Sequence, residues 1–350
     1  MGTRTVFGPR LIGGLVCMLL LSGCERDVAG QVDALFADYA GAATPGAAVL
    51  VIRHGERVFE RGYGSANLET GAPVDAATNF RLASITKQFT ATAIMLLVED
   101  GLLDVDAELR TLFPEFNEYA EGITIRHILQ HQSGMPDYEP MVPDGATEQV
   151  YDADVLRMMA QAEQGYFAPG EDYRYSNSGY AVLAMLVEKL SGMSFPMFLN
   201  ARIFTPLRMR NTVAFVNGQN SVSSRALGYT VTDAGVEETD QSLYSAVLGD
   251  GGVYSSLHDL YLWDQALYTD RLLPADVRAQ MLTPSLENYG FGWRIDRYKG
   301  RLRYHHSGST SGFRNFMQQF PDEGLTVIVL TNRAEPDVKP LAEQVSDLFL

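Results

Sequence analysis

Strand-like runs lie near both ends of the 350-residue chain, and helical patterns fill the middle. Residues 47–52 form an apolar run of strand length, which turns at His54-Gly55 and returns through Tyr63. Four more such runs follow near the other end, at 291–295, 302–305, 313–320 and 325–330. Strands joined by local hairpins pair antiparallel. The simplest closure therefore joins runs from both ends of the chain in one antiparallel sheet, and the expected fold is an antiparallel five-stranded sheet.

Helical periodicity accounts for most of the remaining chain. A long apolar stripe runs from Ser84 to Glu99 and ends at Gly101, a common residue past a helix end. Further helices are expected at 32–39, 125–129, 180–190 and 341–349. Terminal helices would cover the sheet, and the middle of the chain would form a helical lobe beside it. The expected fold class is α/β (α+β), with a cleft between two lobes where a small molecule could bind.

We expect the chain to divide into four parts. They are a signal peptide at 1–23, a tether at 24–30, a sheet lobe made of 31–104 and 250–350, and an inserted helical lobe at 105–249.

Composition and charge narrow the classes of function. Hydrophobic residues make up 46% and charged residues 20%, which is ordinary for a globular protein. The net charge of −16 argues against nucleic acid as a partner, because phosphate binding needs lysine and arginine surfaces. It also argues against docking on anionic lipid by charge alone. No phosphate loop or other cofactor motif stands out, so no cofactor is expected.

The first 24 residues have the pattern of a targeting segment. Arg4 and Arg10 precede an apolar stretch at 11–21, which is too short for the roughly 20 residues of a membrane-spanning helix. The stretch ends in Leu21-Ser22-Gly23-Cys24, which resembles the lipobox of bacterial lipoproteins. That resemblance implies cleavage before Cys24 and a lipid on its sulfur. Glu25, in place of aspartate, favours the outer membrane facing the periplasm over the inner membrane.

Cysteine usage excludes two kinds of site in the mature domain. The chain has two cysteines, and both lie within the first 24 residues. Neither a disulfide framework nor a cysteine-based metal site can therefore form downstream of Cys24.

The segment Ser84-Ile85-Thr86-Lys87 opens the long predicted helix. Residues three apart on a helix share a face, so the lysine amine can reach the serine oxygen. Serine is a weak nucleophile that needs an adjacent base, and a lysine can be that base where its surroundings lower its pKa. The helix N-terminus adds amide N–H groups for a developing oxyanion. The plain alternative is a capping serine near a surface lysine.

Two further segments could complete such a site. Tyr175-Ser176-Asn177 lies in a loop before a helix, where a phenol could shuttle protons and a carboxamide could orient a substrate amide. The plain alternative is a loop that caps the helix. His306-Ser307-Gly308 lies on a C-terminal strand, and its small residues would let a substrate lie along the strand edge.

Together the three segments resemble the penicillin-recognising serine hydrolases. In that family S-x-x-K is followed by Y-x-N roughly 90 residues later and by H/K-S/T-G near the C-terminus. The tyrosine motif resembles the branch that holds class C β-lactamases, D-Ala-D-Ala carboxypeptidases and related esterases. The resemblance covers about 45–332, and the further segments that carry it are Phe80 to Ser84, Ile123 to Pro136, Phe167 to Gly170, and Gly251 to Ser256.

The resemblance implies a role for each matching residue. Ser84 would be acylated, Lys87 and Tyr175 would exchange its proton, and Asn177 would hold the acyl side chain. The backbone N–H groups of Ser84 and Ser309 would form the oxyanion hole, and His306, Ser307 and Gly308 would line the substrate. His306 stands where many members have lysine, and histidine is only partly charged near pH 7. A fixed cation for a substrate carboxylate is therefore in doubt, which leaves esters and small amides open beside β-lactams and D-amino-acid peptides.

Rival enzyme classes fit the sequence less well. An α/β-hydrolase needs a G-x-S-x-G turn, and the nearest match, at 308–312, has threonine at the nucleophile position. His127 and His131 are four apart on a predicted helix, but no third zinc ligand is evident, so they are interpreted as packing or hydrogen-bonding residues. His305 is expected to point away from His306. Trp263 and Trp293 are expected in the core. A different class remains open, a non-catalytic protein that binds penicillin or cell-wall peptide on the same scaffold.

Overall fold

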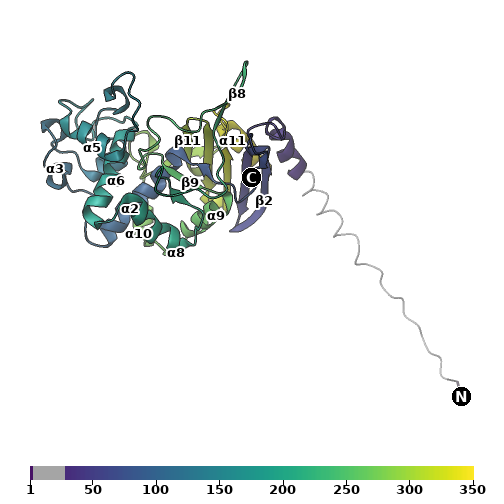
Figure 1. Cartoon of the computed structure of the whole chain (residues 1–350). Helices are drawn as coiled ribbons and strands as arrows, with labels where there is room; N and C mark the ends of the chain where they lie inside the picture. The colour runs from purple at the N-terminus through teal and green to yellow at the C-terminus, as the bar shows by residue number, and fades with distance from the viewer. Residues whose placement is uncertain (3–27) are drawn as a thin grey trace.

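The computed structural model describes residues 1–2 and 28–350 (Figure 1). Cys24, and all of the predicted signal peptide except its first two residues, lie outside the described residues. Among the described residues no single helix is long and apolar enough to span a bilayer, while one pair bent by 76°, Asn177–Ser191 with Phe195–Leu207, meets that criterion together.

The centre of the fold is an antiparallel sheet with the strand order β10-β11-β12-β13-β1-β2. Its strands are β1 (Ala47–Arg53), β2 (Glu56–Tyr63), β10 (Arg294–Tyr298), β11 (Arg301–Thr310), β12 (Phe313–Phe320) and β13 (Leu325–Thr331). The predicted class and the closure of the two chain ends are confirmed, because β1 pairs with β13. The sheet has six strands and not five, since β10 adds an edge strand along the first half of β11.

The predicted start of the strand at 291 was wrong, and the cause is a close contact. The predicted strand at 291–295 is a loop up to Trp293, and β10 begins only at Arg294. Gly292 has φ +76°, and a Cβ there would lie 2.6 Å from the carbonyl oxygen of Lys87. The apolar residues around it therefore form a turn pressed against the long helix, where a straight strand would not fit.

The central strands are apolar throughout because both faces of the sheet are covered. Ala47, Val49 and Val51 of β1 face one core, while Ala48, Leu50 and Ile52 face the other. Side chains alternate between the two faces of a strand, so a strand buried on both sides reads as a continuous apolar run. This is why 47–52 and 325–330 were the clearest strands in the sequence.

Helices from both chain ends cover one face of the sheet. Residues 28–35 are helical and continue into the short turn η1 (Ala37–Tyr39), and α11 (Lys339–Phe349) packs beside them. Val32, Phe36 and Val345 share a hydrophobic cluster with the sheet residues of this face. The other face carries α2 (Thr86–Glu99) and α9 (Leu257–Ala266), whose side chains join the larger core. The predicted core positions Trp263 and Trp293 are each 1% exposed.

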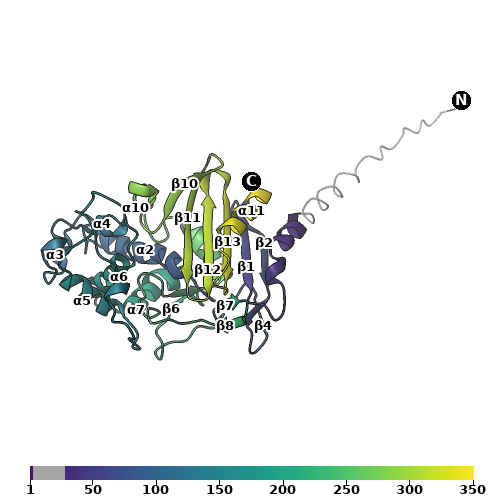
Figure 2. The same ribbon diagram turned by 90° about the horizontal axis from the view of Figure 1, so that it is seen from above.

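The remaining helices lie mainly beyond the β11 end of the sheet, with α2 between them and the strands (Figure 2). They are α3 (Leu109–Leu112), α4 (Ile125–Leu129), α5 (Asp152–Gln161), α6 (Asn177–Ser191), α7 (Phe195–Leu199), α8 (Thr205–Leu207) and α10 (Ala275–Met281). The expected helix at 125–129 has the same bounds as α4, and 180–190 falls inside α6. The division of the chain at 104 and 250 stays a prediction.

Small strands join segments that are far apart in the sequence. β5 (Phe80–Arg81), β9 (Val253–Ser255) and β6 (Val213–Ala214) form a three-stranded sheet in which β9 is central. It holds the segment before Ser84 against the segment after Gly251. Two hairpins complete the fold, β3 (Ser65–Asn67) with β4 (Ala72–Pro73) and β7 (Tyr229–Thr232) with β8 (Gly235–Glu238).

A single buried amide joins the chain ends to the middle of the chain. Asn332, just after β13, is fully buried. Its Oδ1 accepts a hydrogen bond from the backbone N–H of Gly46 at 2.6 Å. Its Nδ2 donates to the carbonyl oxygens of Ser65, Ala66 and Leu227 at 2.8–3.1 Å. Four backbone groups from three segments therefore depend on one side chain.

We expect Asn332→Ala to lower the free energy of unfolding by about 3 kcal/mol, because the buried N–H of Gly46 and the carbonyl oxygens of Ser65 and Leu227 lose the hydrogen bonds to its amide. Urea unfolding followed by tryptophan fluorescence would measure the loss. Gln344→Ala, at an exposed position of α11, is the matched control and should change the value by less than about 0.5 kcal/mol. Equal effects of the two changes would contradict the role given to Asn332.

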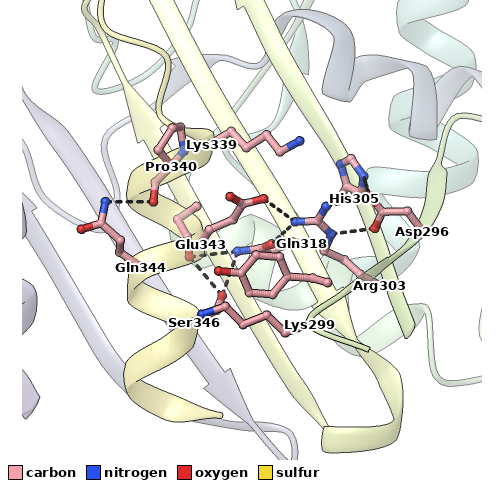
Figure 3. Close-up of polar contacts among 12 residues, drawn as sticks. Asp296, Lys299, Arg303, His305, Gln318, Lys339, Pro340, Glu343, Gln344 and Ser346 are labelled. Carbon is pink, nitrogen blue, oxygen red and sulfur yellow. Dashed lines mark hydrogen bonds and ion pairs between the residues drawn. The ribbon is translucent and has the colours of Figure 1, made fainter. Parts of the chain in front are cut away.

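A second polar network lies on the sheet face covered by α11 (Figure 3). The side chain of Arg303 on β11 is 4% exposed and forms ion pairs of 2.7 Å with Asp296 on β10 and with Glu343 on α11. His305 bonds the same Asp296 carboxylate through Nε2 at 3.2 Å. His305 therefore points away from the His306 side of the strand, as predicted. Burial opposes ionisation of Asp296, but the hydrogen bonds from Arg303 and His305 outweigh it and hold its pKa below the usual value.

This lowered pKa predicts a dependence of stability on pH. A carboxyl whose pKa is lower in the folded state stabilises the fold above its unfolded pKa of about 3.9, and that contribution is lost as the pH falls below it. We expect Asp296→Asn to reduce stability at neutral pH and to flatten the loss of stability between about pH 5 and about pH 2. Unfolding midpoints across that range would measure it, with exposed Asp144→Asn as control. Parallel curves for wild type and Asp296→Asn would refute the assignment.

Candidate active site

Ser84 lies directly before α2, the long helix that packs on the sheet face opposite α11. It belongs to a 3₁₀ turn, η2 (Ala83–Ile85), that leads directly into α2. Ala83 has φ +50°, a left-handed conformation that costs a residue with a Cβ about 1–2 kcal/mol. Such strain is often found at functional positions. The turn leaves Ser84 partly exposed while its neighbours Ala83 and Ile85 are buried.

Lys87 lies one turn further on and is 0% exposed. Its Nζ donates to Ser84 Oγ at 3.1 Å, to Asn177 Oδ1 at 2.9 Å and to the carbonyl oxygen of Asp250 at 2.8 Å. Three acceptors satisfy the three donors of an ammonium group. The structure therefore brings together Ser84 and Lys87, as their spacing predicted, and Asn177, as the family resemblance implied.

Tyr175 contributes its ring to this group but not its hydroxyl oxygen. The ammonium nitrogen of Lys87 lies 4.9 Å from the centre of the Tyr175 ring, within the range of a cation–π contact. The Tyr175 Oη is buried and has no hydrogen-bond partner among the described residues. The predicted proton exchange between Lys87 and Tyr175 would therefore need a shift of the phenol, or a bridging group, on substrate binding.

His131 holds the turn that carries Tyr175 and Asn177. Its Nδ1 accepts a hydrogen bond from the backbone N–H of Ser176 at 3.1 Å, and its carbonyl oxygen accepts one from Arg174 at 2.9 Å. The two rings of His131 and Tyr175 lie 4.3 Å apart. Burial, aided by the charge of Lys87, lowers the pKa of His131 well below its usual value, so the ring is neutral. The predicted hydrogen-bonding role of His131 is confirmed.

His127 also bonds locally. Its Nδ1 accepts from the backbone N–H of Thr124 at 3.2 Å, and Thr124 Oγ1 accepts from the N–H of His127 at the start of α4. Among the described residues no group of three or more histidine, cysteine, aspartate or glutamate side chains is placed to hold a metal ion.

β11 forms the other wall of the site. Its pairing with β10 runs from Arg301 to His305, and in the described part of the chain residues 306–310 then pair on one edge alone, with β12. A Cβ at Gly308 would lie 2.0 Å from the carbonyl oxygen of Leu82, so only glycine lets the strand approach the turn that carries Ser84. Ser307 and Ser309 are both exposed along this strand, and Ser309 lines the pocket beside Ser84.

His306 is 1% exposed, so it lies beneath the strand surface and does not line the pocket beside Ser84. Its Nδ1 donates to the carbonyl oxygen of Ser307 at 2.7 Å, and its Nε2 is left to accept from the hydroxyl of Tyr289 at 2.9 Å. Burial lowers the pKa of His306 well below its usual value, which keeps the ring neutral. The cation that many members carry at this position is therefore missing here.

A pocket of about 390 Å³ opens beside Ser84. Its walls include Asn177, Ser309 and two carboxylates that the sequence analysis did not single out, Glu139 and Asp250. Desolvation of the Asp250 carboxyl, only partly offset by Lys87 and Arg81, raises its pKa to about 6. Glu139 follows the first helical-lobe motif and Asp250 precedes the Gly251-Gly252 pair. In the sequence, only their positions next to these two motifs could have indicated that Glu139 and Asp250 line the site.

The sequence model of the Beta-lactamase family matches residues 32–348. The chain belongs to this family. Penicillin-binding protein 4* of Bacillus subtilis (strain 168) is 33% identical over 309 residues, covering 82% of this chain and 68% of that protein. A D-aminopeptidase of Gluconobacter oxydans (strain 621H) is 28% identical over 311 residues, covering 86% of this chain and 58% of the enzyme. The chain thus spans little more than half the length of that D-aminopeptidase.

Solved structures of Beta-lactamase family relatives agree on the fold. The octameric penicillin-binding protein homologue from Pyrococcus abyssi superposes with a TM-score of 0.80 at 25% identity, covering 94% of this chain and 77% of that one. D-amino acid amidase from Ochrobactrum anthropi SV3 superposes with a TM-score of 0.78 at 24% identity, covering 93% of this chain and 96% of the amidase. These superpositions show that the chain shares the fold of these proteins.

Proposed function

We propose that this protein is a serine hydrolase that forms an acyl-enzyme on Ser84 and cleaves an amide or ester of a small acyl compound, with D-amino-acid amides or peptides as the leading class. The contact that carries the proposal is the 3.1 Å hydrogen bond between Ser84 Oγ and the buried ammonium group of Lys87. An amine in that position can hold the serine oxygen in line for attack and take part in moving its proton.

The reaction would proceed in two halves. The Lys87–Tyr175 pair first loses one proton to solvent, from the ammonium or from the phenol, and Ser84 Oγ then attacks the substrate carbonyl carbon while its proton passes to the vacated position of the pair. The oxyanion is stabilised by the backbone N–H groups of Ser84 and Ser309. The pair then returns the proton to the departing amine or alcohol, which leaves the acyl group on Ser84. Water repeats the sequence on the acyl-enzyme and releases the acid.

Two observations favour amides and esters over substrates that need a cation for a carboxylate. His306 is neutral and buried where many family members carry lysine. Relatives of the chain include enzymes named D-aminopeptidase and D-amino acid amidase. A β-lactam remains a candidate as an acylating agent, since acylation of Ser84 needs only a reactive carbonyl group.

We expect Ser84→Ala to abolish labelling by a fluorophosphonate and to lower kcat/KM for a short-chain 4-nitrophenyl ester by about a thousandfold or more, because the nucleophile is gone. Gel fluorescence and ester turnover would measure the two effects. Ser221→Ala, at an exposed position, is the control and should keep both. Ester hydrolysis at the wild-type rate by Ser84→Ala would end the assignment. If the wild-type protein takes the label on Ser84 but does not turn over the ester, the non-catalytic binding protein is favoured.

We also propose that a lipid on Cys24 anchors the protein in the bacterial envelope, in the outer membrane facing the periplasm. The lipobox-like Leu21-Ser22-Gly23-Cys24 supports this, since several acyl chains on one residue hold a protein stably at a membrane. We expect Cys24→Ser to move the full-length protein from the membrane fraction to the soluble fraction after cell breakage. Extraction that still requires detergent would contradict the anchor.

A further inference from the structure

Two carboxylates without an ion-pair partner face the pocket beside Ser84. Glu139 is half-buried and Asp250 is partly exposed at the pocket wall. None of the ion pairs among residues 28–350 includes either side chain. Two like charges in one partly desolvated pocket repel each other. A pocket of this kind is suited to a ligand that brings a positive charge.

The nearby cations are engaged with neutral oxygens. The guanidinium of Arg81 donates to the carbonyl oxygens of Gly251 at 3.3 Å and Ser245 at 3.0 Å, and to Gln241 Oε1 at 3.4 Å. Lys87 bonds the carbonyl oxygen of Asp250 and not its carboxylate. Within residues 28–350, the Asp250 carboxyl accepts one long hydrogen bond, of 3.4 Å, from the hydroxyl of Tyr138. Most of the hydrogen-bonding capacity of the two carboxylates is therefore free for a ligand.

The position of Glu139 fixes which part of a substrate it would meet. Its Oε1 accepts from Asn177 Nδ2 at 3.2 Å, and Asn177 Oδ1 accepts from Lys87 Nζ. The carboxylate is thus three hydrogen bonds from Ser84 Oγ, on the side where Asn177 would hold the acyl part of the substrate. An α-amino group is two bonds from the carbonyl carbon that Ser84 attacks, so it falls on this same side.

We propose that Glu139 and Asp250 form a subsite for the free ammonium group of an amino-acyl substrate. The enzyme would then cleave amides or esters of amino acids with an unblocked amino end, and would disfavour acyl groups that carry a carboxylate. Charge-assisted hydrogen bonds from an ammonium to the two carboxylates, in a pocket partly shielded from water, supply the preference. This inference rests on the proposed acyl transfer at Ser84.

The test compares two anilides that differ at one group. D-Alanine 4-nitroanilide carries an α-ammonium, and isobutyric acid 4-nitroanilide carries a methyl group of similar size in its place. We expect wild type to favour the ammonium compound, and Glu139→Gln to reduce the ratio of the two kcat/KM values by about tenfold or more, mainly through KM. Comparing the ratio between variants cancels the difference in intrinsic reactivity of the two anilides. Asp250→Asn is a second, independent variant with the same expected direction.

The matched control is Glu148→Gln, which removes one charge at an exposed position of the same lobe and should keep the wild-type ratio. Fluorophosphonate labelling of wild-type Ser84 separates the two proposals. Protein that takes the label but favours the isobutyryl compound, or ignores the alanine anilide, overturns the ammonium subsite and leaves the hydrolase standing. A ratio unchanged in both Glu139→Gln and Asp250→Asn also overturns it. Failure of wild type to take the label overturns both proposals.

Discussion

The buried ammonium group of Lys87 is the constraint on which the rest of the site depends. It has no contact with water and must find its acceptors inside the protein, because an unpaired buried charge is strongly unfavourable. Its three acceptors come from three segments, namely the turn at Ser84, the start of α6 at Asn177 and the loop at Asp250. One nitrogen atom therefore fixes the relative positions of the turn at Ser84, the start of α6 and the loop at Asp250. The same interaction that fixes the packing also fixes the geometry of the site.

The electrostatic character of the site follows from which groups keep their charge. His131 and His306 are buried and neutral, and each is fixed by a backbone hydrogen bond through Nδ1. The charges that remain around the pocket are the cations of Lys87 and Arg81 and the carboxylates of Glu139 and Asp250. The two carboxylates face the pocket, while the two cations are engaged with neutral oxygens. A family member with lysine at the place of His306 would have positive charge on its strand wall.

Much of this could be predicted from the sequence, and the exceptions have physical causes. The strand at 313–320 and the helix at 125–129 were found with their true bounds, because alternation and 3.6-residue periodicity are local signals. The Ser84–Lys87 contact was found because both residues lie on one helical turn. The bend at Gly292 and the pocket position of Glu139 depend on contacts with segments far away in the sequence. The Tyr175 hydroxyl was expected to exchange a proton with Lys87. In the structure the ring of Tyr175 packs against the Lys87 ammonium, and its hydroxyl oxygen has no hydrogen-bond partner among the described residues.

The central position of β1 in the sheet has a consequence for how the chain folds. β1 lies between β2, its neighbour in sequence, and β13, which is separated from it by nearly the whole chain. Until the last strands have been synthesised, the N-terminal hairpin has an open edge and two apolar faces. Such edges readily pair with other chains, and contacts of long sequence separation form slowly. The newly made N-terminal half therefore depends on protection from aggregation until its C-terminal partner arrives.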